Sequence, residues 1–161
     1  MEAEGYERIQ SLDLAMPIWD SFFFVAPLVL IGTKDAGGGY NQAPKHMAFP
    51  MGWDNYFGFV CTPDHSTHQN IEREGAFTVT LPRPTQVILA SLAATPRNDD
   101  NFKPSLLSLP TFEARSVDGR FVSDGFVFLE CELDRFVESF GRNSLIIGRV
   151  VAAHVHERAL R

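Results

Sequence analysis

"GFVFLECELDRFVESF", residues 125–140, alternates apolar and polar side chains from Val127 to Asp134. The two alternating sets are Val127, Leu129, Cys131 and Leu133, and Phe128, Glu130, Glu132 and Asp134. A period of two is typical of a half-buried antiparallel strand, because successive side chains point to opposite faces of the sheet. This stretch therefore predicts a long antiparallel strand with one apolar face.

Similar runs lie on both sides of this strand. Further strands are expected at 25–34, 40–49, 56–62, 76–82, 112–117, 120–123 and 144–157. The glycine-rich segment Asp35–Gly39 fits a hairpin turn and matches no nucleotide-binding loop. Two short helices are predicted, one at 66–75, capped by Ser66 or Thr67 and closed by Gly75, and one at 85–94. Together these elements predict a mainly β fold, with six or seven strands forming a closed or partly closed antiparallel barrel.

The chain is about as long as one domain. It has 161 residues, of which 45% are hydrophobic and 21% are charged, as in ordinary globular proteins. We expect a single domain over residues 1–161. Residues 1–24 are expected to form an N-terminal helical lid, broken at Pro17, that docks the aromatic cluster Trp19, Phe22, Phe23 and Phe24 on the sheet.

Charge and hydropathy argue against two classes of partner. Fourteen Lys and Arg against twenty Asp and Glu give a net charge of −6, which does not support binding to nucleic acid. The longest uncharged stretch, 21–33, is too short to span a bilayer and contains Pro27, so no membrane partner is expected. The acidic N-terminus resembles no secretory signal, and Cys61 and Cys131 each lie in an apolar run, as buried reduced thiols would. These features predict a cytoplasmic protein.

The segment "CTPDHSTHQNI", residues 61–71, concentrates polar side chains directly after an apolar strand. A metal site could use His65, His68 and Asp64, with His46 as a further candidate, but no zinc motif and no clear third ligand are present. A hydrolytic nucleophile at Ser66 or Thr67 is disfavoured because no GxSxG motif is present and neighbouring residues on a helix seldom face each other.

An anion site is the third interpretation of this segment. A helix that begins at Ser66 or Thr67 leaves its first backbone N–H groups free, at the positive end of the helix dipole. Two hydroxyl groups and His65 would add hydrogen-bond donors at the same place. A phosphate monoester is the natural ligand, although Ser66 could equally serve only to cap its own helix.

The longer stretches "NQAPKHMAFPMGWDNYFGFVCTPDHSTHQNIEREGAFTVTLP", residues 41–82, and "FGRNSLIIGRVVAAHV", residues 140–155, resemble the flavin reductase-like FMN-binding domains. This resemblance covers about residues 27–155. It implies the split β-barrel fold, antiparallel and of Greek-key type, with FMN as cofactor and FAD as the alternative.

The resemblance also implies a set of cofactor-binding residues, while no catalytic residue is identified. The strand beside the flavin ring and the phosphate-binding loop would contribute Ala43, Pro44, Lys45, His46, Met47, Ala48, Thr62, His65, Ser66, Thr67 and Arg142. The family's S-x-T motif falls on His65-Ser66-Thr67, so Thr67 matches the threonine and His65 replaces the serine. Reduction of a flavin places negative charge on its N1 side, and we expect Lys45 or Arg142 to compensate that charge.

A second departure from the family concerns the nicotinamide site. Many members carry "GDHT" before the last strand, with the histidine near the nicotinamide, whereas this chain has Gly141-Arg142-Asn143-Ser144. The resemblance implies an NAD(P)H-dependent flavin reductase that acts on small molecules, as a homodimer with the flavin at the subunit interface. The alternative is a non-catalytic protein of the same fold that binds flavin or another phosphate-bearing ligand.

Overall fold

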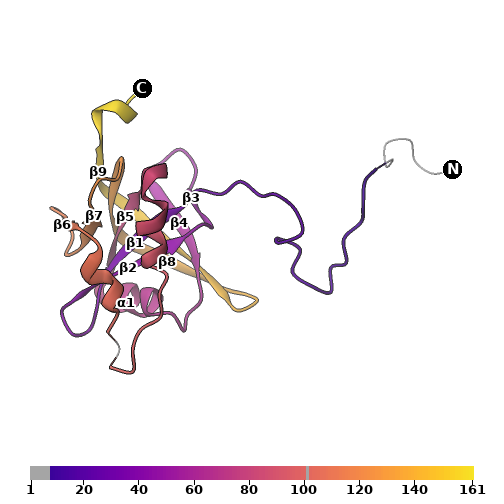
Figure 1. The fold of residues 1–161 in the computed structure, drawn as a ribbon, viewed down its shortest axis with the longest axis horizontal. Helices are drawn as coiled ribbons and strands as arrows, with labels where there is room; N and C mark the ends of the chain where they lie inside the picture. Colours follow the sequence, from indigo (N-terminus) through magenta and orange to yellow (C-terminus); the bar gives the residue numbers. More distant parts are fainter. Residues whose placement is uncertain (1–7, 101) are drawn as a thin grey trace.

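The computed structural model describes residues 8–100 and 102–161, and β-strands dominate them (Figure 1). The strands are β1 (Val29–Lys34), β2 (Tyr40–Lys45), β3 (Ala48–Pro50), β4 (Tyr56–Cys61), β5 (Ala76–Leu81), β6 (Thr111–Glu113), β7 (Arg120–Val122), β8 (Val127–Phe140) and β9 (Asn143–Val155). The helices are α1 (Ser66–Glu74) and α2 (Val87–Leu92), with 3₁₀ turns η1 (Pro84–Gln86), η2 (Pro104–Ser108) and η3 (Glu157–Ala159). The prediction of a mainly β fold with few short helices is confirmed.

Seven of these strands form one antiparallel sheet in the order β2-β1-β5-β8-β9-β4-β3, and β6 and β7 form a separate hairpin. The expected strand at 40–49 is divided: β2 ends at Lys45 and β3 begins at Ala48. Because these two strands are the opposite edges of the sheet and only His46 and Met47 separate them, the sheet must curl until its edges approach each other. The result is an antiparallel split barrel, as expected from the sequence.

The core lies inside the curl. Phe59 of β4 and Phe77 of β5 meet edge to face, with ring centroids 5.4 Å apart, and both are fully buried. Cys61 and Cys131 are also buried and carry free thiols, which confirms that prediction. Burial raises the pKa of the Cys131 thiol to about 12, so it stays protonated.

Strand β8 departs from simple alternation at Glu130. A register shift lies between Glu130 and Cys131, and both side chains are fully buried. The Glu130 carboxylate accepts hydrogen bonds from the backbone amides of Arg115, Ser116 and Val117 at 2.5–3.1 Å and lies 3.0 Å from His154 Nε2. The acidic residue that the pattern placed on the polar face therefore holds the β6–β7 turn against the sheet.

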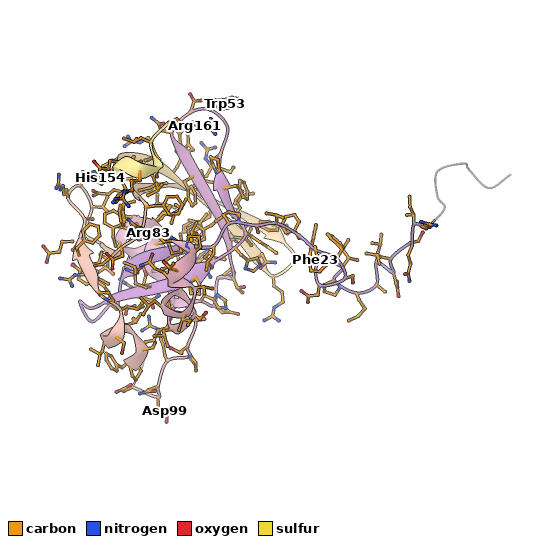
Figure 2. The ribbon with its side chains drawn as sticks, turned by 45° about the horizontal axis from the view of Figure 1, so that its top comes forward. Phe23, Trp53, Arg83, Asp99, His154 and Arg161 are labelled. Atoms are coloured by element: carbon orange, nitrogen blue, oxygen red, sulfur yellow. The ribbon has the colours of Figure 1, made fainter. Side chains whose placement is uncertain are left out.

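The predicted helical lid is not present in the described part of the N-terminal segment. Residues 8–28 contain only turns, bends and irregular backbone, and residues 1–7 lie outside the described residues. The segment runs out from the sheet with Phe23 and Val25 fully exposed (Figures 1 and 2). Pro17 and the β-branched and aromatic residues around it have a low tendency to form a helix. Among the described residues, no other surface packs along this segment to stabilise a helix.

Helix α1 begins at Ser66, as predicted, but its N-cap residue is different. His65, not Ser66 or Thr67, is the N-cap residue, and its side chain makes no capping hydrogen bond. The side-chain amide of Gln69 donates to Asp64 O at 3.5 Å, so Ser66 and Gln69 do not form a capping box. Gly75 closes the helix in the left-handed conformation, at φ 69°, as predicted.

Among residues 8–100 and 102–161, no helix combines the length and the apolar character needed to cross a membrane.

Gly32 of β1 marks the closest approach between the sheet and strand β7. A Cβ atom there would lie 2.4 Å from the Arg120 carbonyl oxygen and 2.2 Å from Thr78 Oγ1. Because the Arg120 carbonyl is part of the backbone, it cannot move aside without shifting its strand. We therefore expect Gly32→Ala to lower the free energy of unfolding by about 1–3 kcal/mol. Denaturant unfolding would measure this change. The matched control is Gly37→Ala, where a Cβ meets nothing within 4 Å and the loss should be small; equal effects would contradict the prediction.

Candidate functional site

The gap between the two edges of the curled sheet contains a cleft of about 270 Å³. We call it the edge cleft; its lining residues are Pro44, Lys45, His46, Met47, Val60, Cys61, Thr62, His65 and Asn143. The chain bends at His46 and Met47 as it passes from β2 to β3, and Val60 N donates to Met47 O at 2.9 Å. The β2–β3 connection is thus held over the ends of β4 and β9.

A second cavity, of about 480 Å³, adjoins the edge cleft and shares Pro44, Lys45 and His65 with it. We call it the anion cavity; its other lining residues are Asn41, Ala43, Asp64, Ser66, Thr67, Ala93, Ala94, Thr95, Pro96, Arg97 and Lys103. Residues from β2, the start of α1 and the loop after α2 therefore meet around one space. Asn41, Ala43 and Lys45 reach it together because alternate residues of a strand share a face.

The start of α1 supplies uncompensated donors to the anion cavity. No side chain of the described residues caps the first turn, so the helix dipole and its free amides face outward at Ser66 and Thr67. Asn41, only 3% exposed, lines the same cavity, and its Oδ1 has no hydrogen-bond partner among the described residues. A buried carboxamide without a partner is costly, which indicates that a ligand completes the site. The oxygen and nitrogen of such an amide can exchange places to suit that ligand.

Lys103 places a cation in the wall of the anion cavity. It is only 7% exposed, and its Nζ donates to Gln42 O at 3.1 Å and also to Ala93 O. Burial lowers its pKa from 10.5 to about 8, and the positive charge of Arg97 contributes to the shift. Two of the three ammonium N–H groups are thus used by the protein, and one remains for a ligand.

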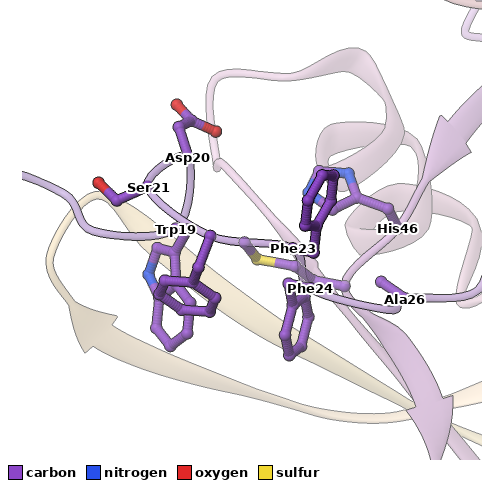
Figure 3. A pocket seen from close by; sticks show the side chains of 9 residues that line it. Trp19, Asp20, Ser21, Phe23, Phe24, Ala26 and His46 are labelled. Atoms are coloured by element: carbon purple, nitrogen blue, oxygen red, sulfur yellow. The ribbon is translucent and has the colours of Figure 1, made fainter. Parts of the chain in front are cut away.

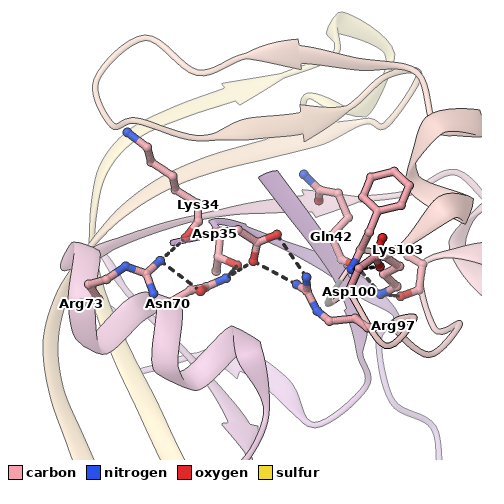
Figure 4. A network of polar contacts seen from close by, with 11 residues as sticks. Lys34, Asp35, Gln42, Asn70, Arg73, Arg97, Asp100 and Lys103 are labelled. Atoms are coloured by element: carbon pink, nitrogen blue, oxygen red, sulfur yellow. Dashed lines mark hydrogen bonds and ion pairs between the residues drawn. The ribbon is translucent and has the colours of Figure 1, made fainter. Parts of the chain in front are cut away.

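Arg97 is held beside Lys103 by a polar network that reaches back to α1 (Figure 4). Its guanidinium pairs with both carboxylate oxygens of Asp35, at 2.9 and 3.3 Å. Asp35 Oδ1 also accepts from Asn70 of α1 at 2.8 Å, and Asn70 Oδ1 accepts from Arg73. The loop after α2, the β1–β2 turn and α1 are therefore linked by charge-assisted hydrogen bonds.

His65 stands where the two cavities meet. Its pKa is lowered, first by burial and then by the nearby Lys45 charge, so the imidazole is neutral near pH 7. Its Nδ1 lies 4.0 Å from Cys61 Sγ, and burial raises the pKa of that thiol. A neutral imidazole beside a protonated thiol can act as a hydrogen-bond donor to an anion without adding charge.

The structure brings most of the sequence-predicted residues together around these cavities. Ala43, Ser66 and Thr67 line the anion cavity; His46, Met47 and Thr62 line the edge cleft; Pro44, Lys45 and His65 line both. Ala48 is buried and lines an apolar cavity next to His46 and Met47. Arg142 lies exposed in the tight β8–β9 turn, while its neighbour Asn143 reaches the edge cleft.

Sequence reasoning missed Asn41, Arg97 and Lys103. The alternation Asn41, Ala43, Lys45 along the strand was a usable signal for the first of these. The cations in "TPRNDDNFKPS", residues 95–105, gave no such signal, because a charged residue in a polar loop normally faces solvent. Only the docking of this loop against β2 buries Lys103.

The structure separates the two histidines considered as metal ligands. His68 is buried and stacks on Phe136, with ring centroids 4.5 Å apart, away from His65. Within the described ranges, no three His, Cys, Asp or Glu side chains lie close enough together to hold a metal ion.

The part of the N-terminal segment nearest the sheet borders the outer side of the edge cleft. Residues 19–24, Ala26, His46 and Met47 line a further cavity (Figure 3). Trp19 contacts the rings of Phe22 and Phe24, at centroid distances of 6.1 and 5.9 Å. Aromatic surface is therefore available directly beside His46 and Met47.

Comparison with known proteins agrees with this architecture. The model of the family described as "Flavin reductase like domain" matches residues 21–161. A Shewanella frigidimarina protein described as a flavin reductase with a split barrel domain is 19% identical, with a TM-score of 0.76, over 84% of this chain and 70% of the other. Flavoredoxin of Desulfovibrio vulgaris is 22% identical, with a TM-score of 0.76, over 94% and 80%. Nitrilotriacetate monooxygenase component B of Bacillus cereus is 18% identical, with a TM-score of 0.80, over 95% and 84%. At these identities the likeness shows a shared fold.

Proposed function

The chain belongs to the flavin reductase-like domain family, and from this premise we propose that it binds FMN and catalyses the reduction of flavin by NADH or NADPH. The observation that carries the proposal is the adjacency of the two cavities: a cation-lined space at the start of α1 opens beside a cleft between the sheet edges. An elongated ligand with an anionic tail and a flat head fits this arrangement.

The residues present suit a flavin mononucleotide. The phosphate would be held by the first backbone amides of α1, by Thr67, and by the cations Arg97 and Lys103. The side-chain amide of Asn41, whose Oδ1 has no partner among the described residues, would accept a hydrogen bond from the ligand or donate one to it. The ring would lie along Pro44–Met47, where the edge strand β2 ends in a bend and leaves backbone groups outside the ladder of sheet hydrogen bonds.

When bound, the flavin supplies the redox chemistry by accepting two electrons as a hydride from a reduced nicotinamide. The residues of this chain then need only orient the ligands and exclude water. Lys45, which lines both cavities, contributes positive charge, and the apolar side chain of Met47 excludes water on the outer side. No acid–base pair is required, in keeping with a site that contains none of the usual catalytic arrangements.

The direct test combines binding and turnover. The purified protein is expected to be yellow or to become so with FMN, and to oxidise NADH or NADPH when free FMN is supplied. Absence of flavin binding, measured by fluorescence quenching at micromolar protein, would overturn the proposal.

A second candidate function is flavin binding without nicotinamide turnover. Asn143 favours it, because it lines the edge cleft at the position where many family members carry a histidine near the nicotinamide. Bound flavin without NADH or NADPH oxidation would select this alternative. Restored oxidation in Asn143→His, with unchanged FMN affinity, would then assign the difference to this residue.

We also propose that the active form is a homodimer in the cytoplasm, with the flavin near the subunit interface. Large apolar side chains are exposed beside the edge cleft, along the N-terminal segment and between β3 and β4, including Phe140 (43%), Phe23 (106%) and Trp53 (104%). Surfaces of this kind usually meet a partner. Sedimentation analysis is expected to give a dimer, and a stable monomer that retains flavin would contradict this placement.

The charge of Lys45 gives a further prediction about the bound flavin. A nearby cation favours the reduced, anionic form, so we expect Lys45→Met to lower the reduction potential of the bound flavin. Titration with a reference dye would measure the potential. The matched control is Lys34→Met, an exposed lysine that pairs with Asp118 outside both cavities. An unchanged potential in Lys45→Met would remove Lys45 from this role.

The pH dependence of binding follows from Lys103. Its pKa of about 8 in the free protein is lowered by burial and by Arg97 and Lys45, and opposed by Asp35; a bound phosphate raises it. The contribution of Lys103 to FMN affinity should therefore be complete below about pH 8 and decrease as the pH rises through 8 to 9. Riboflavin, which carries the same ring without the phosphate, is the control ligand. Equal pH dependence of the two affinities would contradict the assignment.

A further inference from the structure

A third cavity, of about 250 Å³, lies on the far side of Arg97 and Lys103 from the edge cleft. We call it the distal cavity; its other lining residues are Asp35, Gly39, Tyr40, Gln42, Phe102, Leu106, Leu107, Leu109, Thr111 and Arg120. Arg97 and Lys103, which Figure 4 labels, line both this cavity and the anion cavity, so the two spaces share one cationic wall.

The distal cavity contains a buried polar group that the protein leaves unpaired. Gln42 is only 2% exposed; its Nε2 donates to Arg120 O at 2.8 Å, whereas its Oε1 has no partner among the described residues. The Nε of Arg120 is likewise buried without a hydrogen-bond partner in the described part of the chain. A buried acceptor of this kind indicates a ligand that brings an N–H group.

The remaining walls suit a flat ring. The Arg120 guanidinium lies over the ring of Tyr40 at 5.4 Å, and Thr111 and Glu113 hold its two terminal nitrogens. Leucines and Phe102 supply apolar surface. The volume is below the range of about 300–1,000 Å³ that holds a whole drug-sized ligand, so the cavity suits one nucleoside-sized part of a larger molecule.

We propose that the distal cavity is an adenylate subsite. The adenine amino group would donate to Gln42 Oε1, the ring would lie between the Tyr40–Arg120 pair and the leucines, and the phosphate would meet the Arg97–Lys103 wall. Two dinucleotides carry this group next to a second phosphate: FAD and the nicotinamide dinucleotides. Their connection to the anion cavity rests on the proposed flavin site, whereas the adenylate chemistry rests on the distal cavity alone.

Gly39 offers a variant that fills this cavity without disturbing the fold. It lines the cavity, its backbone is not left-handed, and a Cβ atom there meets nothing within 4 Å. Gly37 has the same properties in the same turn but does not line the cavity. Gly39→Leu is therefore the test variant and Gly37→Leu its matched control.

The experiment uses AMP as the probe, with calorimetry on the full chain. Wild type and Gly37→Leu should bind AMP, and Gly39→Leu should lose at least about tenfold in affinity while binding FMN normally. If FAD serves as the natural ligand, Gly39→Leu weakens FAD but not FMN. If a nicotinamide dinucleotide does, the same variant raises the KM for NADH and leaves that for reduced nicotinamide mononucleotide unchanged.

The result that overturns the subsite is FMN binding by the wild type without AMP binding, or equal loss of AMP affinity in both glycine variants. Absence of FMN binding with AMP binding intact would instead overturn the proposed function and leave the adenylate subsite standing.

Discussion

Lys103→Met is expected to weaken FMN binding by about 10- to 100-fold. The substitution preserves the length of the side chain but removes a buried cation whose remaining N–H group would donate to the FMN phosphate in the proposed complex. Charge-assisted hydrogen bonds of this kind contribute about 1.5–3 kcal/mol. Fluorescence titration would measure the dissociation constant. Because Lys103 also donates to Gln42 O and Ala93 O, the variant should unfold at lower denaturant concentration as well.

Riboflavin separates these two effects of Lys103→Met. A loss of phosphate recognition lowers FMN affinity alone, whereas a disturbed cavity lowers the affinities for FMN and riboflavin together. Lys34→Met, which removes an exposed lysine with a surface partner, should leave both affinities unchanged. Equal weakening of FMN and riboflavin by Lys103→Met would contradict a phosphate contact at this residue.

Glu130→Gln is expected to lower the free energy of unfolding by about 3 kcal/mol. The carboxylate is fully buried and accepts from three consecutive backbone amides, and an amide side chain would lose the charge and turn an N–H₂ group toward those donors. Urea unfolding would measure the loss. The matched control is Glu132→Gln, whose carboxylate pairs with Arg149 on the surface and should contribute less than about 1 kcal/mol.

The pH dependence of the Glu130→Gln effect has a definite sign. Burial by itself raises the pKa of Glu130, but the hydrogen bonds from Ser116 N, His154 and the other amides outweigh it, and the net pKa is lowered. A carboxyl group with a depressed folded-state pKa stabilises the protein above its ordinary value of 4.5 and loses that stabilisation as the pH falls below it. The difference between wild type and Glu130→Gln should therefore shrink below pH 4.5. A difference that stays constant there would show that the carboxylate charge is not its origin.

Local sequence pattern predicted the structure correctly where a single physical principle decided the conformation of a segment. Alternating side chains located β8, the glycine-rich turn located the β1–β2 hairpin, and Gly75 marked the end of α1. Local pattern failed where two rules competed. The aromatic residues before Pro27 suggested a docked helix, but no helix is found at 8–28. Helix nucleation is unfavourable, and the apolar surface of these aromatic residues does not offset it without a continuous helix-forming sequence.

The antiparallel β architecture, the buried thiols and the position of α1 could all be predicted from the amino-acid sequence, because each depends on side-chain period or backbone conformation over a few neighbouring residues. The folded chain was needed to show that Asn41, Arg97 and Lys103 meet at the start of α1 and that Glu130 is buried. Those placements depend on the curl of the sheet and on loops distant in sequence. Whether a charged side chain is buried depends on the partners that surround it in the folded protein, and the local sequence period carries no information about those partners.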